Sequence, residues 1–359
     1  MWSRQDIEQH SVDIRQFIDF RQSRLENGMR LVEAYNGSGL SFNLLPDRGL
    51  DIWQAFYNSR PLTWVSQGSP HKPDLGQEWL RQFNGGLLVT CGLTHVGPPE
   101  KDAITGEWRD IHGLYSRLPA KDLRVTGYWD GDDHYWLELS GVVTEAILFG
   151  EQLRLERVYS MRLGEATIRL QDTITNLGDM PAPLMALYHF NVGYPLVGAG
   201  ARLYTASEQV APRDDRAVAG LERWAEYDTA TAQYEEQVFF HHLKADTSGE
   251  TEVLLCRDDM ALAMKWNSND LPYFTQWKNT RQGIYVSGIE PGNCIPEGRN
   301  AARESERLVM LEPGDSRMSS VSLRILDRSE AIQGFVQRIA DLQKTGRAVP
   351  GCDLSGYPR

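Results

Sequence analysis

The chain has 359 residues, of which 41% are hydrophobic and 10% aromatic, and its formal net charge is −12. This apolar content is enough for a sizeable core, so the sequence predicts a globular protein of one large β domain or two ordinary domains. The negative charge argues against a nucleic-acid-binding surface, which needs a basic face. It also disfavours long-range attraction of polyanions, although a local basic pocket stays open as an alternative.

The polar N-terminal segment and the cysteines indicate a cellular compartment. The four cysteines are scattered and form no CxxC pair, which is typical neither of a disulfide scaffold nor of a zinc site. Charges occur throughout the first 17 residues, so no signal peptide is predicted, and no run of 18 apolar residues could span a membrane. We therefore expect a cytoplasmic protein with reduced thiols and no membrane contact.

Turn signals divide the first third of the chain into short apolar runs. Residues 3–22 are polar with few apolar side chains, which predicts a loose arm or a short helix. From Met29 onward, turn dipeptides such as Asn-Gly separate the apolar runs, as in successive β-hairpins. Residues 74–83 are predicted to form a short helix, and the continuous apolar run over 85–92 predicts a buried strand.

The clearest hairpin covers residues 153–176, where apolar and polar residues alternate with the period of a half-buried strand. One long helix is predicted over 329–345, capped by Ser329 and ended by Gly346, with an apolar stripe of Ile, Phe, Val and Leu. Further strands are expected over 123–143 (two strands), 183–191, 202–210, 252–256, 260–266, 273–278, 284–290, 307–312 and 316–326.

Many strands and few helices predict an all-β, antiparallel fold. No internal repeat and no linker is visible, so we expect one large twisted sandwich. Residues 1–25 are expected to form an N-terminal arm, 26–328 the sandwich that carries any catalytic site, and 329–359 a C-terminal helix and tail packed on the same domain.

The segment around Glu290 combines a predicted strand with an abrupt turn. Residues 284–289 are rich in β-branched side chains, and Pro291, Gly292 and Asn293 follow directly. Proline has no N–H for a strand ladder, so Glu290 is predicted to be the last side chain of its strand. A carboxylate held there can act as a general base, although a solvated Glu at a strand end is the commoner outcome.

Three histidines interrupt apolar or turn segments. His95 follows the buried strand over 85–92, His112 precedes a glycine, and His189 lies inside the very apolar segment 183–191. A single histidine in such a position is more often structural than functional. Clustered histidines with a glutamate could also bind a metal, but no HxH or HExxH spacing occurs, so we expect no metal site.

One carboxylate with one or two histidines suits proton transfer. The markers of acyl transfer, dinucleotide binding and phosphoryl transfer (GxSxG, GxGxxG and GxxxxGK[ST]) do not occur. Interconversion of sugar anomers needs only a base for the anomeric hydroxyl and an acid for the ring oxygen. Neutral sugars also need aromatic faces and planar polar groups, for which the candidates are Trp277, Tyr273, Tyr188, Lys278, Arg48, Arg117, Asn84 and Gln276.

Several segments resemble the aldose 1-epimerase (galactose mutarotase-like) superfamily, and most closely its DUF4432 branch. They are PDRGLDI (46–52), FNGGLLVTCGLTHVGPP (83–99), HGLYSRLPA (112–120), NLGDMPAPLMALYHFNVGYPL (176–196), FTQWKNT (274–280) and IEPGNCIPEGR (289–299). These segments span most of the chain in the expected order, and the similarity to characterised mutarotases rests on shorter motifs.

The resemblance implies a β-supersandwich with an open sugar-binding groove, and it implies roles for individual residues. His189 is similar to the histidine that acts as acid at the ring oxygen, His112 to a loop histidine that helps hold that oxygen, and Glu290 to the base. Arg48 and Lys278 match substrate-binding positions. The family works without metal or organic cofactor, so the resemblance implies none here. His95 has no clear counterpart, and we include it as a candidate.

The stretch that follows Glu290 departs from simple mutarotases. It could shape the pocket for a modified or phosphorylated sugar, with Arg299 or Arg303 as anion contacts. The expected partner is therefore a monosaccharide, free or modified, bound by a monomer or homodimer. Two alternatives remain: a non-catalytic sugar-binding or sensing protein on the same fold, and a lyase or hydrolase. A glycosidase would need two facing carboxylates, and only Glu290 is a clear candidate.

Overall fold

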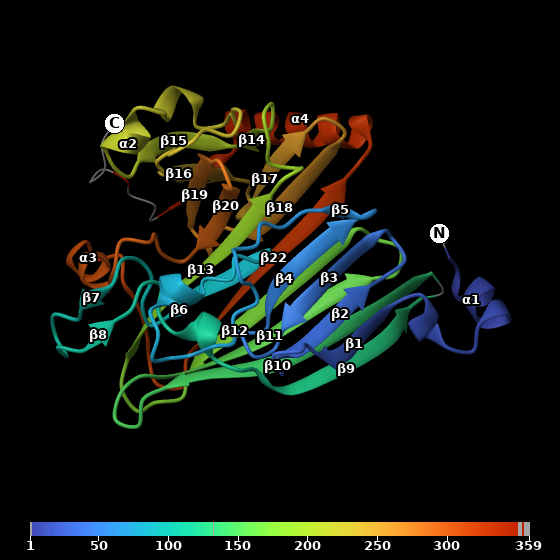
Figure 1. Cartoon of the computed structure of the whole chain (residues 1–359), viewed down its shortest axis with the longest axis horizontal. Coiled ribbons are helices and arrows are strands. Elements are labelled where there is room, and N and C mark those ends of the chain that lie inside the picture. Colours follow the sequence, from blue (N-terminus) through green and yellow to red (C-terminus); the bar gives the residue numbers. More distant parts are fainter. Residues whose placement is uncertain (1, 132, 351–353, 355–359) are drawn as a thin grey trace.

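A computed structural model describes residues 2–131, 133–350 and 354, and it confirms the all-β, antiparallel fold (Figure 1). Three large sheets make up the molecule. A five-stranded sheet has the order β1-β2-β3-β4-β5, and its strands are β1 (Asp19–Arg24), β2 (Arg30–Tyr35), β3 (Leu40–Leu45), β4 (Asp51–Tyr57) and β5 (Arg60–Pro61).

An eight-stranded sheet, here called the back sheet, has the order β14-β17-β18-β22-β12-β11-β10-β9. Its strands are β9 (Lys121–Asp130), β10 (His134–Ala146), β11 (Gln152–Arg162), β12 (Thr167–Asn176), β14 (Arg202–Thr205), β17 (Glu250–Arg257), β18 (Met260–Asn267) and β22 (Ser316–Leu326). The predicted hairpin over 153–176 is the pair β11–β12, whose inward side chains alternate with outward ones as expected.

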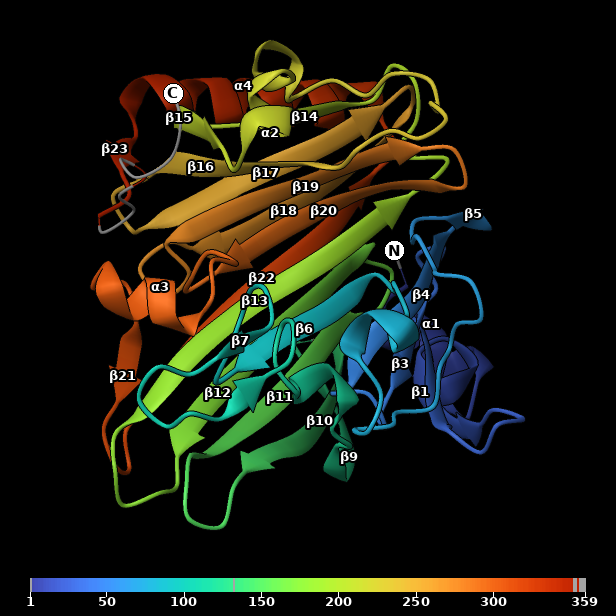
Figure 2. The same cartoon turned by 60° about the vertical axis from the view of Figure 1, so that its left-hand side comes forward.

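A second eight-stranded sheet, here called the front sheet, has the order β15-β16-β19-β20-β13-β21, with β23 added beside β16 and β6 beside β13 (Figure 2). Its strands are β6 (Leu88–Leu93), β13 (Ala182–Gly193), β15 (Ser207–Pro212), β16 (Gln237–Ala245), β19 (Tyr273–Arg281), β20 (Ile284–Gly292), β21 (Val309–Leu311) and β23 (Arg347–Ala348). A small hairpin of β7 (Glu100–Lys101) and β8 (Trp108–Arg109) follows β6.

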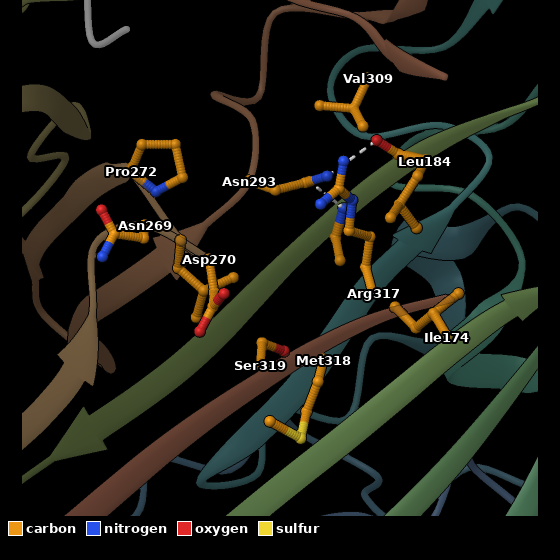
Figure 3. Close-up of a pocket in the computed structure, with 12 residues that line it drawn as sticks. Ile174, Leu184, Asn269, Asp270, Pro272, Asn293, Val309, Arg317, Met318 and Ser319 are labelled. Atoms are coloured by element: carbon orange, nitrogen blue, oxygen red, sulfur yellow. Dashed lines mark hydrogen bonds between the residues drawn. The ribbon is translucent and has the colours of Figure 1, made fainter. Parts of the chain in front are cut away.

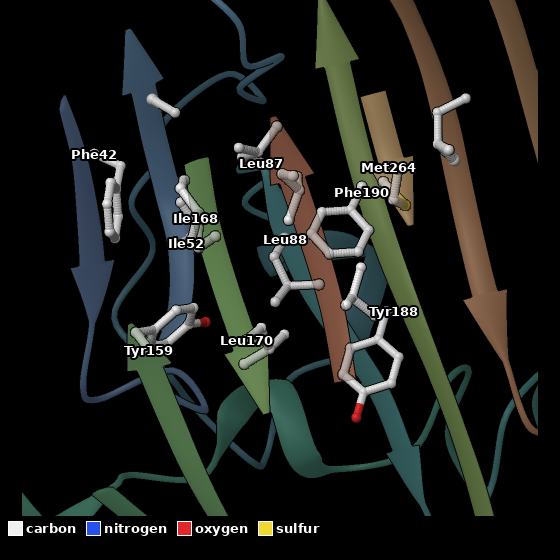
Figure 4. Close-up of a cluster of buried hydrophobic side chains, with 14 of the residues drawn as sticks. Phe42, Ile52, Leu87, Leu88, Tyr159, Ile168, Leu170, Tyr188, Phe190 and Met264 are labelled. Atoms are coloured by element: carbon white, nitrogen blue, oxygen red, sulfur yellow. The ribbon is translucent and has the colours of Figure 1, made fainter. Parts of the chain in front are cut away.

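The core lies between the sheets. Side chains from the five-stranded sheet, the back sheet and the front sheet meet in one cluster, to which Phe42, Tyr159, Leu170, Tyr188 and Phe190 contribute (Figure 4). Tyr188 and Phe190 alternate with His189 on β13, so one face of this strand packs into the core and the other face turns away from it. That second face carries the candidate site.

The few helices are α1 (Arg4–His10), α2 (Asp215–Val218), α3 (Arg299–Glu304), α4 (Ser329–Thr345) and the 3-10 turns η1 (Ile14–Gln16), η2 (Trp79–Gln82), η3 (Tyr115–Arg117) and η4 (Leu221–Arg223). Helix α4 confirms the predicted long helix, which packs Ile332, Phe335 and Ile339 on the back sheet and ends at Gly346. Its N-cap is Arg328, without a side-chain cap bond, so the prediction that Ser329 caps the helix is wrong.

Two segments differ from the prediction for the first third of the chain. Residues 3–22 contain the expected short helix, but their end enters β1, which pairs with β2. Residues 74–83 form only the turn η2, because the Gln82 side chain binds both backbone groups of Asp74 and Gly76 interrupts the segment. The domain boundaries given above stay predictions.

In the part of the chain that the structure describes, no helix is long and apolar enough to cross a membrane. The three cysteines in that part, Cys91, Cys256 and Cys294, are free thiols. Cys352 lies outside the described residues.

Candidate active site

Two neighbouring strands of the front sheet bring His189 and Glu290 together. All 12 residues of β13 are buried. It pairs with β20 so that Phe190 lies opposite Ile289, and the same register sets His189 opposite Glu290. The imidazole Nε2 and the carboxyl Oε1 are 3.1 Å apart. Two groups that can each carry a proton therefore face each other.

Glu290 does not end its strand, so that prediction is wrong. Strand β20 continues through Pro291 to Gly292 and stays paired with β19 on its other side. The pairing with β13 is interrupted beside His189, where Pro291 has no N–H to donate. The proline thus interrupts the hydrogen bonding between β20 and β13 without ending β20. Glu290 is therefore only 2% exposed and does not lie at an exposed end of the sheet.

A glycine on the same strand makes room for the carboxyl group of Glu290. Gly288 lies two residues earlier, on the same face of β20. A Cβ at Gly288 would lie 2.1 Å from Glu290 Oε1 and 2.9 Å from Trp277 Cβ, which is closer than such atoms can approach. The glycine therefore allows the carboxyl group to fold back between His189 and Trp277.

His112 joins this pair from a loop. Its backbone is left-handed (φ 56°), and its N–H donates to Gly97 O while its C=O accepts from Gly92 N, both at 3.0 Å. The next residue must be a glycine, because a Cβ at Gly113 would lie 2.5 Å from Gly92 O. The His112 ring lies 6.2 Å from the His189 ring. The loop after β8, held against the end of β6 by these bonds, thus presents the second histidine to the site.

Aromatic rings surround the two histidines. Trp277 lies 5.5 Å and Phe83 6.1 Å from the His189 ring, and Trp79 lies 5.1 Å from the His112 ring. Trp79 stacks on Phe83 at 4.5 Å, and Trp64 contacts Phe83 and Trp277 at 6.0 and 6.5 Å. Trp64, Phe83, Trp277 and His112 are partly exposed, whereas His189 and Glu290 are buried. The pair thus lies beneath a rim of aromatic faces.

Several buried polar atoms on this face have no hydrogen-bond partner among the described residues. They are His189 Nδ1, His112 Nδ1, Asn191 Oδ1, Thr275 Oγ1 and Glu290 Oε1, whose 3.1 Å contact with His189 Nε2 lacks the angles of a hydrogen bond. Asn191 lies two residues after His189, and Thr275 pairs directly with Glu290, so strand periodicity puts all four strand side chains on one face. Buried polar atoms are almost always paired in proteins, so such a concentration of unpaired atoms makes this face the candidate site.

Burial controls the protonation of the three central groups. It lowers the pKa of His189 to about 4, and it lowers the pKa of His112, next to His189 and His95, to about 3. Burial also raises the pKa of Glu290 well above its ordinary value, with a further increase from the nearby Glu236 and a smaller opposing effect of Arg213. Both histidines are therefore neutral at neutral pH, and burial favours the protonated form of the Glu290 carboxyl group.

Arg48 and Asn84 lie beside this site, and both bind the backbone of the loop at His71. The Arg48 guanidinium donates to His71 O at 3.0 Å and to Gln82 O at 3.1 Å, and Asn84 Oδ1 accepts from His71 N at 2.8 Å. Both side chains line a small cavity together with Val89, which pairs with His189 across β6 and β13. Their contacts are to the backbone, so their proposed contact with substrate stays a prediction.

His95, Arg117 and Arg299 are buried and do not join the His189–Glu290 pair. His95 donates from Nε2 to Pro98 O at 2.9 Å, and Arg117 binds Asp110 at 2.9 Å. Arg299 binds Asp102 at 3.1 Å and Glu151 at 2.7 Å. Arg303 also binds Asp102, so neither of the two expected anion contacts is available as an unpaired cation.

Lys278 points away from the site. It neighbours Trp277 on β19, and successive side chains of a strand lie on opposite faces. Its ammonium donates to Arg223 O at 2.9 Å and lies 5.5 Å from the Tyr227 ring. Tyr188 and Gln276 lie on the same opposite face, where Tyr188 donates to Asp172. The structure therefore does not bring Lys278 together with Trp277, His189 and Glu290.

Several side chains of the site were not predicted from the sequence. Trp79 and Phe83 lie in the segment that was predicted to be a short helix, and Trp64, Asn191 and Thr275 were not among the predicted site residues. Periodicity could have found the last two, because each shares a face with a predicted site residue. Glu236 accepts a hydrogen bond from Trp277 Nε1 at 2.8 Å. It lies in a polar segment without strand periodicity, so no sequence pattern pointed to it.

A separate cavity of about 220 Å³ lies between the front and back sheets and has a different character (Figure 3). Its wall is mostly apolar, and Asn293 ties β20 to β13 there by accepting from Ala186 N at 2.7 Å and donating to Leu184 O at 2.9 Å. Its lining includes no histidine and no buried carboxyl group. Among the described residues, no group of three or more His, Cys, Asp or Glu side chains could hold a metal ion.

Comparison with known families decides the classification. The model of a domain of unknown function, DUF4432, matches residues 26–325. The chain belongs to the DUF4432 family. No curated protein matches the sequence.

Solved structures similar to this DUF4432 protein share its galactose mutarotase-like fold. A Klebsiella pneumoniae protein provisionally described as an aldose 1-epimerase is 25% identical, with a TM-score of 0.83 over 91% of this chain and 88% of that one. A galactose mutarotase-like protein from Clostridium acetobutylicum is 15% identical (TM-score 0.62, 87% and 99% covered). The galactose 1-epimerase of Lactobacillus acidophilus is 15% identical (TM-score 0.58, 87% and 99% covered).

Proposed function

We propose that this DUF4432 protein is an aldose 1-epimerase-like isomerase that interconverts the anomers of a sugar by opening its ring. The observation that carries the proposal is the His189–Glu290 pair, 3.1 Å apart, buried, and beneath partly exposed aromatic rings. The ring oxygen and the anomeric hydroxyl are bonded to the same carbon atom, so an acid and a base that serve them must be close neighbours.

The proposed reaction moves two protons. The carboxylate of Glu290 takes the proton of the anomeric hydroxyl, and the imidazolium of His189 gives its proton to the ring oxygen as the bond between that oxygen and the anomeric carbon breaks. The product is an open-chain aldehyde beside a neutral imidazole and a protonated carboxyl group. Rotation about the next carbon–carbon bond and reversal of both transfers yields the other anomer.

The carboxylate–imidazolium pair that starts the reaction forms when the proton of the Glu290 carboxyl group passes to His189 Nε2, which lies 3.1 Å from Oε1. The state that holds the open-chain sugar has its proton on Glu290 and a neutral His189, which is the distribution that burial favours. His112 is neutral and reaches the same region, so it can hydrogen-bond the sugar without competing as an acid. The rings of Trp277 and Phe83 offer apolar faces for the sugar C–H groups.

A panel of aldoses tests the proposal. Each pure anomer is dissolved freshly, and the change of optical rotation is followed with and without protein. Faster equilibration of at least one sugar is expected. If a sugar binds but equilibrates at its spontaneous rate, the protein is a sugar-binding module instead.

We expect the rate to depend on pH in a bell shape. The active pair holds one proton, so the rate falls below about pH 4, where His189 gains a second proton, and falls again above the raised pKa of Glu290. Replacement Glu236→Gln removes a charge that raises this pKa, so the alkaline limb should move to lower pH while the acidic limb stays. A pH–rate profile of kcat checks this, and an unmoved alkaline limb would contradict the assignment.

Substitution Gly288→Ala should displace the carboxyl group of Glu290, because the added methyl group takes the space of Oε1. A misplacement of about 1 Å can cost roughly 100-fold in rate. We expect kcat to fall by about that factor with some loss of thermal stability, because the added methyl group also crowds Trp277 Cβ on the neighbouring strand. Gly334→Ala on helix α4, where an added Cβ meets no atom within 4 Å, serves as the control, and equal activity of both variants would contradict the role of Gly288.

A further inference from the structure

A cavity of about 320 Å³ lies next to the candidate active site, and residues at the end of β6, on β8 and in the following loop line it. Figures 1 and 2 show how the β7–β8 hairpin follows β6 there. Segments 75–78, 94–95, 108–110 and 113–117 line it, and we call it the Trp108 pocket. The Trp108 side chain is 69% exposed at its wall. The volume of the Trp108 pocket is at the lower end of the range for small-molecule sites.

The Trp108 pocket adjoins the candidate active site. Gly113 lines the Trp108 pocket, whereas the adjacent His112 ring contacts Trp79 in the candidate active site. The carboxyl group of Asp110 connects both sides, because its Oδ2 accepts from Trp79 N at 3.0 Å and binds Arg117 at 2.9 Å. A ligand in one site is therefore a neighbour of a ligand in the other.

Side chains that line the pocket carry unused hydrogen-bonding atoms. Arg109 Nε and Arg117 Nε are buried donors without a partner among the described residues. His95 is fully buried, and burial lowers its pKa, so it is neutral at neutral pH. Its Nε2 donates to Pro98 O, and its Nδ1, 3.6 Å from Glu100 Oε1, makes no hydrogen bond to the described residues. These donors and this acceptor lie just behind the surface of the pocket, so a bound hydroxyl group reaches them after a small shift of the side chains.

The charges of the pocket argue against an anionic ligand. Arg109 binds Glu107 at 2.7 Å and Glu151 at 3.0 Å, and Arg117 binds Asp110. Each guanidinium is therefore neutralised by a carboxylate, and no unpaired cation is left for a phosphate group. Together with an exposed indole face, this pattern suits a neutral ring that carries hydroxyl groups.

We propose that the Trp108 pocket is a second saccharide subsite. The substrate of the proposed epimerase is then a reducing disaccharide or longer saccharide, with its reducing ring at His189 and Glu290 and the next ring against Trp108. This inference rests on the proposed function for turnover, but saccharide binding to the pocket can be measured without it.

The test compares monosaccharides (glucose, galactose) with reducing disaccharides (maltose, cellobiose, lactose), using both anomer exchange and saturation-transfer NMR. Trp108→Ala should raise KM and weaken binding of the preferred disaccharide by about tenfold, with unchanged monosaccharide kinetics. Arg109→Lys, which keeps a positive charge but lacks the Nε donor, should act in the same direction. Trp2→Ala, at an exposed tryptophan on the N-terminal segment, is the matched control.

The outcomes separate the two proposals. If monosaccharides are turned over and Trp108→Ala affects mono- and disaccharides equally, the subsite is refuted and the epimerase stands. If nothing is turned over but Trp108→Ala weakens disaccharide binding, the subsite stands and the epimerase is refuted. If no saccharide is turned over or bound, both are refuted. Thermal unfolding of each variant shows whether the fold is intact.

Discussion

Replacing Glu290 by glutamine is expected to lower kcat by roughly 10²–10⁴-fold, the usual contribution of a general acid or base. Glutamine keeps the shape of the side chain but cannot accept the proton of the anomeric hydroxyl. His189→Asn should have an effect of similar size, because asparagine cannot deliver a proton to the ring oxygen. Binding of the sugar, measured by NMR titration, should change far less than kcat.

The double variant distinguishes a working pair from two independent groups. The effects of substitutions on residues that act as one unit are not additive. The double variant Glu290→Gln with His189→Asn should therefore lower kcat little more than the worse single substitution. Glu145→Gln and His241→Asn are matched controls, since each replaces a buried Glu or His outside the site. Variants of Glu290 and His189 that stay active but unfold earlier would show that these residues are structural.

The Glu290→Gln protein should also be more stable than the parent above about pH 5. Burial raises the pKa of Glu290 in the folded chain, so the folded state holds a proton that the unfolded state releases. The stability of the parent therefore falls as pH rises from the ordinary Glu value through the raised one, whereas the glutamine variant lacks this loss. The difference in Tm should disappear toward pH 4.

Loss of Arg157 is expected to cause the largest fall in stability. This side chain is fully buried between the sheets and binds Asp51 at 2.6 Å and Asp172 at 2.7 Å. It also donates to Thr90 on β6 at 2.9 Å, and Tyr188 on β13 donates to Asp172 at 2.8 Å. Arg157→Met leaves two buried carboxyl groups without their cation, which typically costs about 3–5 kcal/mol.

Urea unfolding measures this cost. Arg154→Met is the matched control, because Arg154 lies on the same strand and pairs with Glu156, but is 40% exposed. An exposed ion pair contributes about 0–1 kcal/mol, so the control should change the free energy of unfolding little. Adding Asp51→Asn and Asp172→Asn to Arg157→Met should recover part of the loss. Equal effects of Arg157→Met and Arg154→Met would contradict the importance of the buried network.

Local patterns predicted the strands well because their signals are periodic. The alternation over 153–176 predicted β11 and β12, and the apolar segment around His189 predicted β13. The same periodicity explains why Lys278 was misplaced: a motif puts it next to Trp277 in sequence, but strand geometry puts the two side chains on opposite faces. Whether two side chains share a site is thus predicted better by the strand face on which they lie than by their adjacency in a sequence motif.

Other features depend on contacts between distant segments and could not be predicted. Proline after Glu290 suggested a strand end, yet pairing with β19 carries β20 past it. Arg299 looked like an anion contact until the fold brought Asp102 and Glu151 to it. The aromatic rim needs Trp64, Trp79 and Phe83 to meet Trp277, and no local pattern encodes that meeting.

Magnetisation-exchange NMR tests the central claim most directly. At equilibrium, selective inversion of one anomer's signal shows how fast it converts into the other, and no coupling enzyme or stopped reaction is needed. For at least one sugar of the panel, the parent protein should accelerate exchange well above the rate in buffer, and Glu290→Gln at the same concentration should reduce that acceleration by about 100-fold or more. Equal acceleration by the parent and the Glu290→Gln variant would contradict the account.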